Sequence, residues 1–509
     1  MTEPLVEIDG QALTIEDICQ VARHACAFLL GDAPAFIERI NKGAEFIETL
    51  LQEEGFVYGV TTGYGDSCTV SIPLENVNEL PRHLYTFHGC GLGIHFDAQQ
   101  TRAIMAVRLN SLAQGFSGVR YQLLQQITQL LHHDILPLIP QEGSVGASGD
   151  LTPLSYLAAV LAGERDVLYQ SEKMAASAVF AQLQITPLTL KPKEGLAIMN
   201  GTAVMTALAC LAYQRAAYLA QLATRITSLA SIALNGNAYH FDEKLFAVKP
   251  HAGQIKVAAC IRADLQITFD PPRNDTRLQD RYSLRCAPHV IGVLEDALPW
   301  FRQFIENELN SANDNPIIDA ENGHVLHGGH FYGGHIAFAM DSMKTAVANL
   351  ADLLDRQMAQ LVDTKFNNGL PANLSGANSR QAMLNHGFKA VQIGVSAWTA
   401  EALKLTMPAS VFSRSTECHN QDKVSMGTIA ARDCLRIIEL TEQVAAAMLV
   451  AVVQGVELRG NTAGLSAGLR ITMAQVRAKI PFLESDRAME QELRLCLQLI
   501  RERHWELYE

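Results

Sequence analysis

The chain has 509 residues, enough for a large hydrophobic core and for two or three structural regions. Hydrophobic residues make up 48% and charged residues 18% of the sequence, a balance that is typical of globular proteins and excludes a disordered or fibrous chain. The formal net charge is −13, and an acidic surface repels phosphate backbones, so we expect no nucleic-acid partner.

The sequence predicts neither a targeting signal nor a membrane partner. Residues 1–5 contain an acidic side chain and no apolar run, unlike a secretory signal. The most apolar later stretch, 444–453, is too short to cross a bilayer and is expected to be a buried core helix. The ten cysteines include no Cys-x-x-Cys pair, so we expect reduced thiols and no metal site. The expected location is cytoplasmic.

The predicted helices are long, rich in Ala and Leu, and poor in charge. In chain order they cover residues 202–233, 338–363, 391–406 and 429–458. Because such helices must pack on one another, the expected fold is mainly α with a long central helical bundle. A loop-rich N-terminal region, 1–200, is expected to carry the chemistry, followed by the bundle, 201–460, and a C-terminal helical cap, 461–509. Apolar helix faces that one chain cannot cover favour an oligomer.

Glycine-rich stretches separate these helices, and loops on a rigid scaffold are frequent sites of chemistry. They lie at 58–65, 89–93, 143–149 and 328–334. In the sharpest of them, Gly143, Gly146 and Gly149 permit a tight turn, and Thr152-Pro153 marks the start of a helix. Composition alone favours an ordinary glycine-rich turn that caps a helix.

The run from Ala147 to Leu154, Ala-Ser-Gly-Asp-Leu-Thr-Pro-Leu, resembles the signature of the aromatic amino acid ammonia-lyases, the family of histidine, phenylalanine and tyrosine ammonia-lyases. Five further segments resemble motifs of that family, in the same order: Tyr58 to Gly65, Asn200 to Thr202, Gln279 to Cys286, Asn310 to Pro316 and Asn420 to Gly427. The resemblance implies that Ala147, Ser148 and Gly149 cyclise autocatalytically into 4-methylidene-imidazole-5-one. The residues suit this chemistry, because the Gly149 nitrogen in a tight turn can attack a carbonyl and Ser148 can lose water. A nearby helix N-terminus would strengthen the resulting electrophile.

The sequence departs from the family pattern at four positions. Thr61 stands where Asn is usual, Tyr64 where Phe is usual, and His289 where Gln is common, while His330 replaces the Asn of Gly-Asn-Phe. We expect these changes to alter the shape of the pocket or the rate, and none removes a residue to which the resemblance gives a chemical step.

The resemblance assigns roles to individual residues beyond the three that cyclise. Tyr58 would be the base that removes the β-proton, which requires a phenol pKa well below the usual value of about 10. Arg285 would bind the substrate carboxylate in bidentate fashion. Asn200, Gln279 and Tyr282 would hydrogen-bond the cofactor or the amino acid backbone, Phe331 would shield the cofactor, and Gly65, Leu151, Glu417 and Gln421 would lie by the substrate. Taken singly, each of these residues would more often pack, cap a helix or form a structural ion pair, so only the joint match favours the catalytic roles.

The pair Phe87-His88 stands where the family sets its substrate preference. Histidine lyases tend to carry Ser-His there, phenylalanine lyases Phe-Leu and tyrosine lyases His-Leu, so this pair is a hybrid. Phe87 suits an aromatic ring, and His88 could hydrogen-bond a phenol or an imidazole, or merely a backbone carbonyl. Gln421 replaces the Glu with which histidine lyases bind imidazole, and Glu417 matches phenylalanine-type members. The predicted order is therefore tyrosine, giving 4-coumarate, then phenylalanine, giving cinnamate, then histidine.

Other functions stay open on the sequence alone. An aminomutase with the same cofactor, which returns ammonia to the β-carbon, is not separated from a lyase. A catalytically silent homologue is disfavoured by the intact tripeptide, Tyr58 and Arg285. The resemblance also implies a homotetramer in which neighbouring chains complete each active site.

Overall fold

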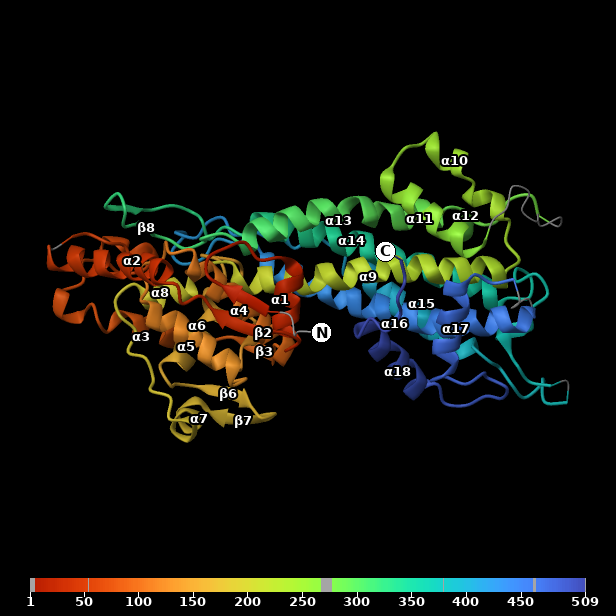
Figure 1. Ribbon diagram of the computed structural model, residues 1–509, viewed down its shortest axis with the longest axis horizontal. Coiled ribbons are helices and arrows are strands. Elements are labelled where there is room, and N and C mark those ends of the chain that lie inside the picture. The colour runs from red at the N-terminus through yellow and green to blue at the C-terminus, as the bar shows by residue number, and fades with distance from the viewer. Residues whose placement is uncertain (1–4, 54, 267–276, 379, 461–463, 509) are drawn as a thin grey trace. The chain divides into compact units, whose positions relative to one another are not determined.

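The computed structural model describes residues 5–53, 55–266, 277–378, 380–460 and 464–508 (Figure 1). The fold is mainly α, which confirms the predicted class. Two compact units divide the chain: unit 1 contains Met1–Gln214, Arg302–Asp341 and Pro408–Arg432, and unit 2 contains Arg215–Phe301, Ser342–Met407 and Asp433–Glu509. Because each unit gathers segments that are distant in sequence, the three sequence regions proposed above stay a prediction.

The four longest helices each contribute residues to both units: α9 (Ala203–Ala233), α13 (Ala287–Leu309), α14 (Gly334–Val362) and α16 (Gly427–Arg459). The predicted helices 202–233, 338–363 and 429–458 correspond to α9, α14 and α16, and 391–406 corresponds to α15 (Lys389–Lys404). All four helix predictions are confirmed to within four residues at each end. Sequence patterns had not separated α13 from its surroundings.

Unit 1 adds shorter helices and four small sheets to the expected loops. Its helices are α1 (Ile15–Ala22), α2 (Pro34–Gln52), α3 (Leu80–Phe87), α4 (Ala98–Ala113), α5 (Tyr121–His132), α6 (Leu151–Leu161), α7 (Ala176–Leu183) and α8 (Glu194–Met199), with 3-10 turns at Gly65–Thr69 (η1), Leu74–Asn76 (η2) and Ser410–Phe412 (η5). Its strands are β1 (Leu5–Ile8), β2 (Ala27–Leu30), β3 (Leu92–His95), β4 (Leu136–Pro137), β5 (Pro140–Glu142), β6 (Asp166–Tyr169), β7 (Glu172–Ala175), β8 (Ile317–Asp319) and β9 (His324–Leu326). They pair as β1-β2, β3-β5, β4-β6-β7 and β8-β9.

One of these strand pairings and the packing of three helices bring the predicted site segments together. The antiparallel ladder between β3 and β5 sets Leu92 opposite Glu142, so the segment after Phe87-His88 lies beside the segment that leads into the tripeptide loop. Helices α3, α6 and α8 pack against one another in the same part of unit 1 (Figure 1). The tripeptide immediately precedes α6, and the Phe87-His88 pair lies at the C-terminal end of α3.

Unit 2 is built on the remaining parts of the long helices. Its shorter elements are η3 (Ala238–Phe241), α10 (Glu243–Ala247), α11 (Ala252–Asp264), α12 (Tyr282–Arg285), η4 (Ala372–Leu374), α15, α17 (Ala467–Arg477) and α18 (Glu490–Arg501). Glu442 of α16 accepts hydrogen bonds from Arg215 of α9 at 2.8 Å and from Arg501 of α18 at 3.2 Å. These ion pairs tie α9, α16 and α18 together around an apolar interior.

Helix α16 is the central core helix of unit 2. Among the described residues it is the one helix long and apolar enough to cross a membrane, and 89% of its most apolar window is buried inside the protein. Every residue from Val444 to Val453 is at most 1% exposed. The expected buried core helix at 444–453 is thereby confirmed, because burial against other helices accounts for its apolar character.

Candidate active site

The tripeptide loop is a tight turn that only small residues can form. Ser148 has φ 49° and Gly149 has φ 79°, both in the left-handed region. A Cβ on Gly149 would lie 2.1 Å from the carbonyl oxygen of Gly201, so this position has to be glycine. The Gly201 N–H donates to the Ser148 carbonyl at 3.1 Å, and the Asp150 N–H donates to the Gly201 carbonyl at 2.8 Å. The loop is thus fixed to the Asn200-Gly201 segment on both sides of Gly149.

Asp150, next to the tripeptide, anchors the loop to two helices. Its buried carboxylate accepts hydrogen bonds from the Val204 and Met205 N–H groups at the start of α9, both at 3.0 Å. It also accepts from the hydroxyls of Ser144, at 3.3 Å, and of Thr428 at the start of α16. Burial raises the pKa of Asp150 to about 6, while these hydrogen bonds oppose the rise. A carboxylate at a helix N-terminus is favourable, so Asp150 fixes where the tripeptide lies relative to α9.

Two adjoining cavities, of about 520 and 500 Å³, meet at the tripeptide. The residues that line both are Tyr58, Gly65, Ser148, Asn200 and Gln421. The first cavity continues along Ala147, Phe331 and Asn420 to Val424, and the second along Leu84, Phe87, His88, Leu151, Leu196 and Glu417. The structure therefore gathers eleven predicted site residues around these cavities: Tyr58, Gly65, Phe87, His88, Ala147, Ser148, Leu151, Asn200, Phe331, Glu417 and Gln421.

Tyr58 presents its hydroxyl to the loop that follows it. The Gly65 N–H donates to the Tyr58 hydroxyl oxygen at 2.7 Å. Burial raises the pKa of Tyr58 above its ordinary value, and the nearby Glu417 and Cys68 add to the rise, whereas the Gly65 N–H opposes it. The Gly65 N–H thus lowers the pKa of Tyr58, as the role of a base requires, but burial raises this pKa by more. The low pKa expected for a catalytic phenol is not present in this chain alone.

Gly65 and Glu417 approach each other closely at the rim of the second cavity. Gly65 has φ 59°, and a Cβ there would lie within 2.4 Å of the Glu417 carboxylate. That carboxylate accepts from the Asp66 N–H at 2.8 Å and from the Asn420 amide at 2.9 Å. Glu417 is therefore held by the loop that also holds Tyr58, and substitution of Gly65 would disturb both.

Asn200 offers an open hydrogen-bond acceptor toward the cavities. Its backbone carbonyl accepts from Arg108 Nη1 at 3.0 Å, which fixes the backbone. Its side-chain Oδ1 is buried and has no hydrogen-bond partner among the described residues. A buried polar atom normally has a partner, so this oxygen is placed for a group that enters the site.

The second cavity has an aromatic and apolar wall. The rings of Phe87 and His88 lie 4.6 Å apart, and Leu84, Leu151 and Leu196 line the same space. Burial, followed by the positive charge of Arg165, lowers the pKa of His88 to about 4. His88 is thus a neutral imidazole at physiological pH. Its ring makes no hydrogen bond to any part of the chain that the structure describes, which leaves it available to a ligand.

Three predicted site residues lie elsewhere. Gln279, Tyr282 and Arg285 belong to unit 2, and none of them lines either cavity. Arg285 donates from Nε to the Asp280 carbonyl at 2.9 Å, and its guanidinium lies 4.7 Å from the centre of the Tyr282 ring. Tyr282 is 71% exposed. Tyr282 and Arg285 thus contact each other in α12, with Gln279 three residues before it, and all three lie outside unit 1.

The four departures from the family pattern have different surroundings. Only Tyr64 lines one of the two cavities. The Thr61 hydroxyl accepts from the Val57 N–H at 2.9 Å and stabilises the loop before it. His330 is exposed, and His289 lies in unit 2, stacked on Phe246 at 5.2 Å. The expected influence on pocket shape therefore applies to Tyr64.

Several residues in the site had not been singled out from the sequence. Cys68, Asn315 and His327 line the first cavity, and the His327 ring stands edge-on to Tyr58 with 6.4 Å between centroids. His327 directly precedes the glycine-rich stretch 328–334, and Asn315 is part of a quoted motif, so both had a signal in the sequence. Cys68 had none, because it lies beyond the end of its motif.

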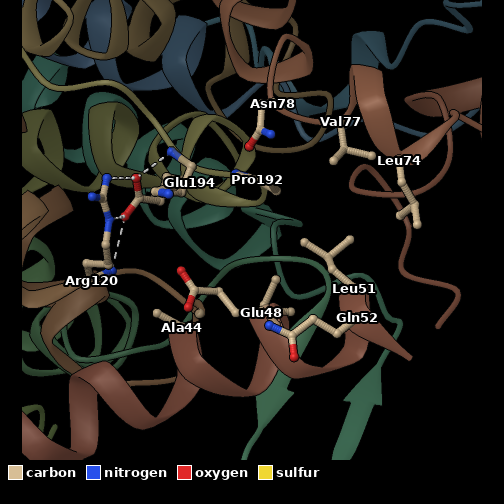
Figure 2. Close-up of a pocket in the computed structure, with 13 residues that line it drawn as sticks. Ala44, Glu48, Leu51, Gln52, Leu74, Val77, Asn78, Arg120, Pro192 and Glu194 are labelled. Atoms are coloured by element: carbon tan, nitrogen blue, oxygen red, sulfur yellow. Dashed lines mark hydrogen bonds and ion pairs between the residues drawn. The ribbon is translucent and has the colours of Figure 1, made fainter. Parts of the chain in front are cut away.

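A further cavity of unit 1 lies away from these residues, between α2 and the segment before α8 (Figure 2). It has a volume of about 290 Å³, and no predicted site residue lines it. Its principal charged groups bind each other, since Arg120 and the buried Glu194 form an ion pair at 2.7 Å (Figure 2). This pair stabilises the start of α8, and through it the position of Asn200.

The residues around the tripeptide fit the cofactor that the resemblance implies. The turn at Ser148 and Gly149 excludes side-chain bulk, the start of α6 follows at once, and the unpartnered Asn200 oxygen is buried beside the cavities. These are the features that cyclisation and an electrophile at a helix N-terminus require.

Comparisons with known proteins identify the family of this chain. The profile of the family described as aromatic amino acid lyase matches residues 13–478. The chain is 36% identical over 498 residues to a histidine ammonia-lyase of Shouchella clausii, covering 98% of both chains. It resembles the crystal structure of a tyrosine aminomutase from Streptomyces globisporus with a TM-score of 0.91 and 35% identity, covering 98% of this chain and 97% of that one. A phenylalanine aminomutase of Pantoea agglomerans gives a TM-score of 0.90 and 30% identity, covering 98% and 99%. The chain thus belongs to the aromatic amino acid lyase family and is a carbon–nitrogen lyase.

Proposed function

We propose that the protein eliminates ammonia from an aromatic L-amino acid to give the trans-2,3-unsaturated aryl acid, with tyrosine preferred and phenylalanine next. The observation that carries this proposal is the second cavity, which Ser148 and Tyr58 line together with Phe87 and His88. An aromatic ring against Phe87 would bury apolar surface, and the neutral His88 imidazole could hydrogen-bond a phenol hydroxyl. A cytoplasmic location stays a prediction.

In the proposed reaction, a 4-methylidene-imidazole-5-one formed from Ala147, Ser148 and Gly149 supplies the electrophile that turns the amine into a leaving group. Tyr58 accepts the β-proton, and the Gly65 N–H stabilises the phenolate that this role requires. The open Asn200 oxygen receives a hydrogen bond from the site, and Phe331 covers the cofactor side of the first cavity. Arg285, with Gln279 and Tyr282, binds the carboxylate from a neighbouring chain.

Histidine is the alternative substrate, and the named histidine ammonia-lyase relative favours it. Two features of the site disfavour it. Gln421 is uncharged, and its side-chain oxygen already accepts from the Thr416 hydroxyl at 3.0 Å. The aminomutase outcome is supported by the names of two structural relatives, and it uses the same first half-reaction.

The test is a panel of L-tyrosine, L-phenylalanine and L-histidine, followed by ultraviolet absorbance of the unsaturated acid. We expect the highest kcat/KM with tyrosine, because a site that hydrogen-bonds a hydroxyl discriminates against substrates that lack it. A wild type that prefers histidine would overturn the order. Chromatography of the products separates the two reaction types, since accumulation of a β-amino acid in place of the aryl acid would identify an aminomutase.

We further propose a homotetramer with active sites shared between chains, because the family resemblance implies one and Arg285 lines neither of the cavities at the tripeptide. Chains with Tyr58→Phe and chains with Arg285→Ala are each expected to keep only a small residual activity when assembled alone. Co-assembly should restore part of the activity, since some shared sites then contain both native residues. Light scattering of the wild type gives the assembly size. A fully active monomer, or mixed assemblies without recovery, would contradict the proposal.

A further inference from the structure

Arg165 lies behind the aromatic wall, where no role has been assigned to it. It follows α6 closely and has φ 67°, a backbone conformation that aims its side chain back along that helix. The guanidinium packs over the Tyr156 ring, 4.3 Å from its centre. From there Nη1 donates to the Ser155 hydroxyl at 3.1 Å, and Nη2 donates to the Tyr85 backbone carbonyl. Arg165 therefore connects α6 to the last turn of α3.

Ser155 extends this connection to the specificity pair itself. Its hydroxyl is fully buried and lies 3.2 Å from the His88 carbonyl and 2.7 Å from the Thr152 carbonyl. Thr152 is the second residue of α6, three positions after Gly149. The hydroxyl oxygen accepts a hydrogen bond from Arg165, and the hydroxyl can donate its hydrogen to either carbonyl. One short network thus joins the helix that begins at the tripeptide to the segment that carries Phe87 and His88.

The end of α3 is adapted to this cation. The carbonyls of the last helical turn lack partners within the helix and carry partial negative charge, so a guanidinium placed there is favourable. Gly89 is what lets it approach, because a Cβ at that position would lie 2.3 Å from Arg165 Nη2. A side chain at position 89 would therefore displace the guanidinium from its present place.

The neighbouring charges do not take over this role. Glu164 is bound on the outer side of α3, where it accepts from Arg82 Nε at 3.2 Å and from the Tyr85 hydroxyl at 3.1 Å. Arg82 is 75% exposed at its side chain and makes no contact with Ser155 or His88. Arg165 is the cation whose bonds reach both α6 and the end of α3.

We propose that Arg165, acting through Ser155 and the Tyr85 carbonyl, is a positioning residue that holds Phe87 and His88 at a fixed place relative to the tripeptide and so sets selectivity for the substrate ring. The proposal deepens the function proposed above and rests on the second cavity as the substrate site. Neither side chain lines that cavity, so they act only through the residues they hold. The positive charge of Arg165 also contributes to keeping the His88 imidazole neutral.

The test uses the full-length protein with Arg165→Met, with Ser155→Ala as a second variant that keeps the charge, and with Arg82→Met as the matched control. Binding of 4-coumarate and of cinnamate is measured by calorimetry, and kcat/KM is measured for tyrosine and phenylalanine. We expect Arg165→Met and Ser155→Ala each to lower the preference for the hydroxylated ligand over the other ligand by roughly fivefold or more. The change should come chiefly from Kd and KM. Arg82→Met should keep the wild-type preference. Intact mass should still be two waters below the encoded mass, because the tripeptide is untouched.

A double-mutant cycle with His88→Leu separates positioning from general damage. If Arg165 acts through the specificity pair, Arg165→Met should change the preference much less in the His88→Leu background than in the wild type. Equal loss of binding for both ligands, or additive effects in the cycle, would overturn the proposal. If histidine gives the highest kcat/KM of the panel, only the proposed tyrosine preference is refuted. The same double-mutant cycle would then be measured with the two ligands that the wild type binds most tightly. A wild type that binds no aryl acid would refute both.

Discussion

Replacing Ser148 by alanine is expected to leave the protein at least one water heavier than the mature wild type and to abolish its lyase activity. The wild type should be lighter than its encoded mass by two waters, one lost on ring closure and one from the Ser148 side chain. Without that side chain no methylidene carbon forms, and the amine has no electrophile. Loss of a covalent catalytic group removes the main route, so kcat should fall by at least about a thousandfold. Intact-protein mass spectrometry and ultraviolet assay of the aryl acid measure the two effects.

Ser144→Ala is the matched control in the same loop. Ser144 donates to Asp150 at 3.3 Å and accepts from the Gly146 N–H at 3.2 Å, but it lies outside the tripeptide. This variant should still lose two waters. An active wild type that keeps its full encoded mass would disprove the cofactor, as would a Ser148→Ala protein with normal turnover.

Much of the bundle could be predicted because its signals are local. The run 444–453 is apolar on every face, which is typical of a helix buried on all sides, and each of its residues is buried. The start of α14 could not be predicted from local sequence signals. Gly333 and Gly334 had been assigned to a loop, yet α14 begins at Gly334. A Cβ on Gly333 would lie 2.1 Å from Met205 Sδ, so the glycine serves the packing of two helices.

The chemistry of the tripeptide was visible in the sequence, but the groups that hold it were not. Arg108 is one of two arginines in α4 and is fully buried, and burial lowers its pKa to about 10. Its Nη1 donates to the Asn200 carbonyl at 3.0 Å and to Asn313 Oδ1 at 3.2 Å. Those partners are 92 and 205 residues away, a distance that no local pattern spans.

The residues assigned through motif resemblance fall into two groups in the structure, again because a motif says nothing about distant parts of the chain. A motif indicates the role of Arg285 or Tyr282, but not which chain of an assembly supplies that residue to a given site. The structure groups eleven predicted residues at the cavities and leaves Gln279, Tyr282 and Arg285 together in unit 2. The site shared between chains that we propose would account for both groups, and the low pKa expected for Tyr58 would require the same completion.

Replacing Tyr58 by phenylalanine is expected to lower kcat/KM by about 10²- to 10⁴-fold, the scale of a lost general base. The pH dependence of kcat/KM is a sharper test of Tyr58 as the base. Because burial raises the pKa of Tyr58, the phenol is mostly protonated at neutral pH in this environment. The wild-type kcat/KM should therefore rise with pH, approaching about tenfold per unit below the pKa of Tyr58, as the phenolate fraction grows. His88, with a pKa of about 4, stays neutral throughout this range and adds no second limb.

The Tyr64→Phe variant is the control, because it removes a different hydroxyl from the same loop and leaves Tyr58 in place. Tyr64 belongs to the same loop and lines the second cavity, and phenylalanine is the usual residue at this place in the family. The Tyr64→Phe protein should retain the rising limb, whereas Tyr58→Phe should lose it along with the rate. Charge from the neighbouring chain that lowers the pKa of Tyr58 would shift the limb to lower pH, and Arg285→Lys, which preserves charge, should move it less than Arg285→Ala. A Tyr58→Phe enzyme that keeps both the limb and most of its activity would show that another group removes the β-proton, and His327, edge-on to the Tyr58 ring at 6.4 Å, would then be the residue to replace.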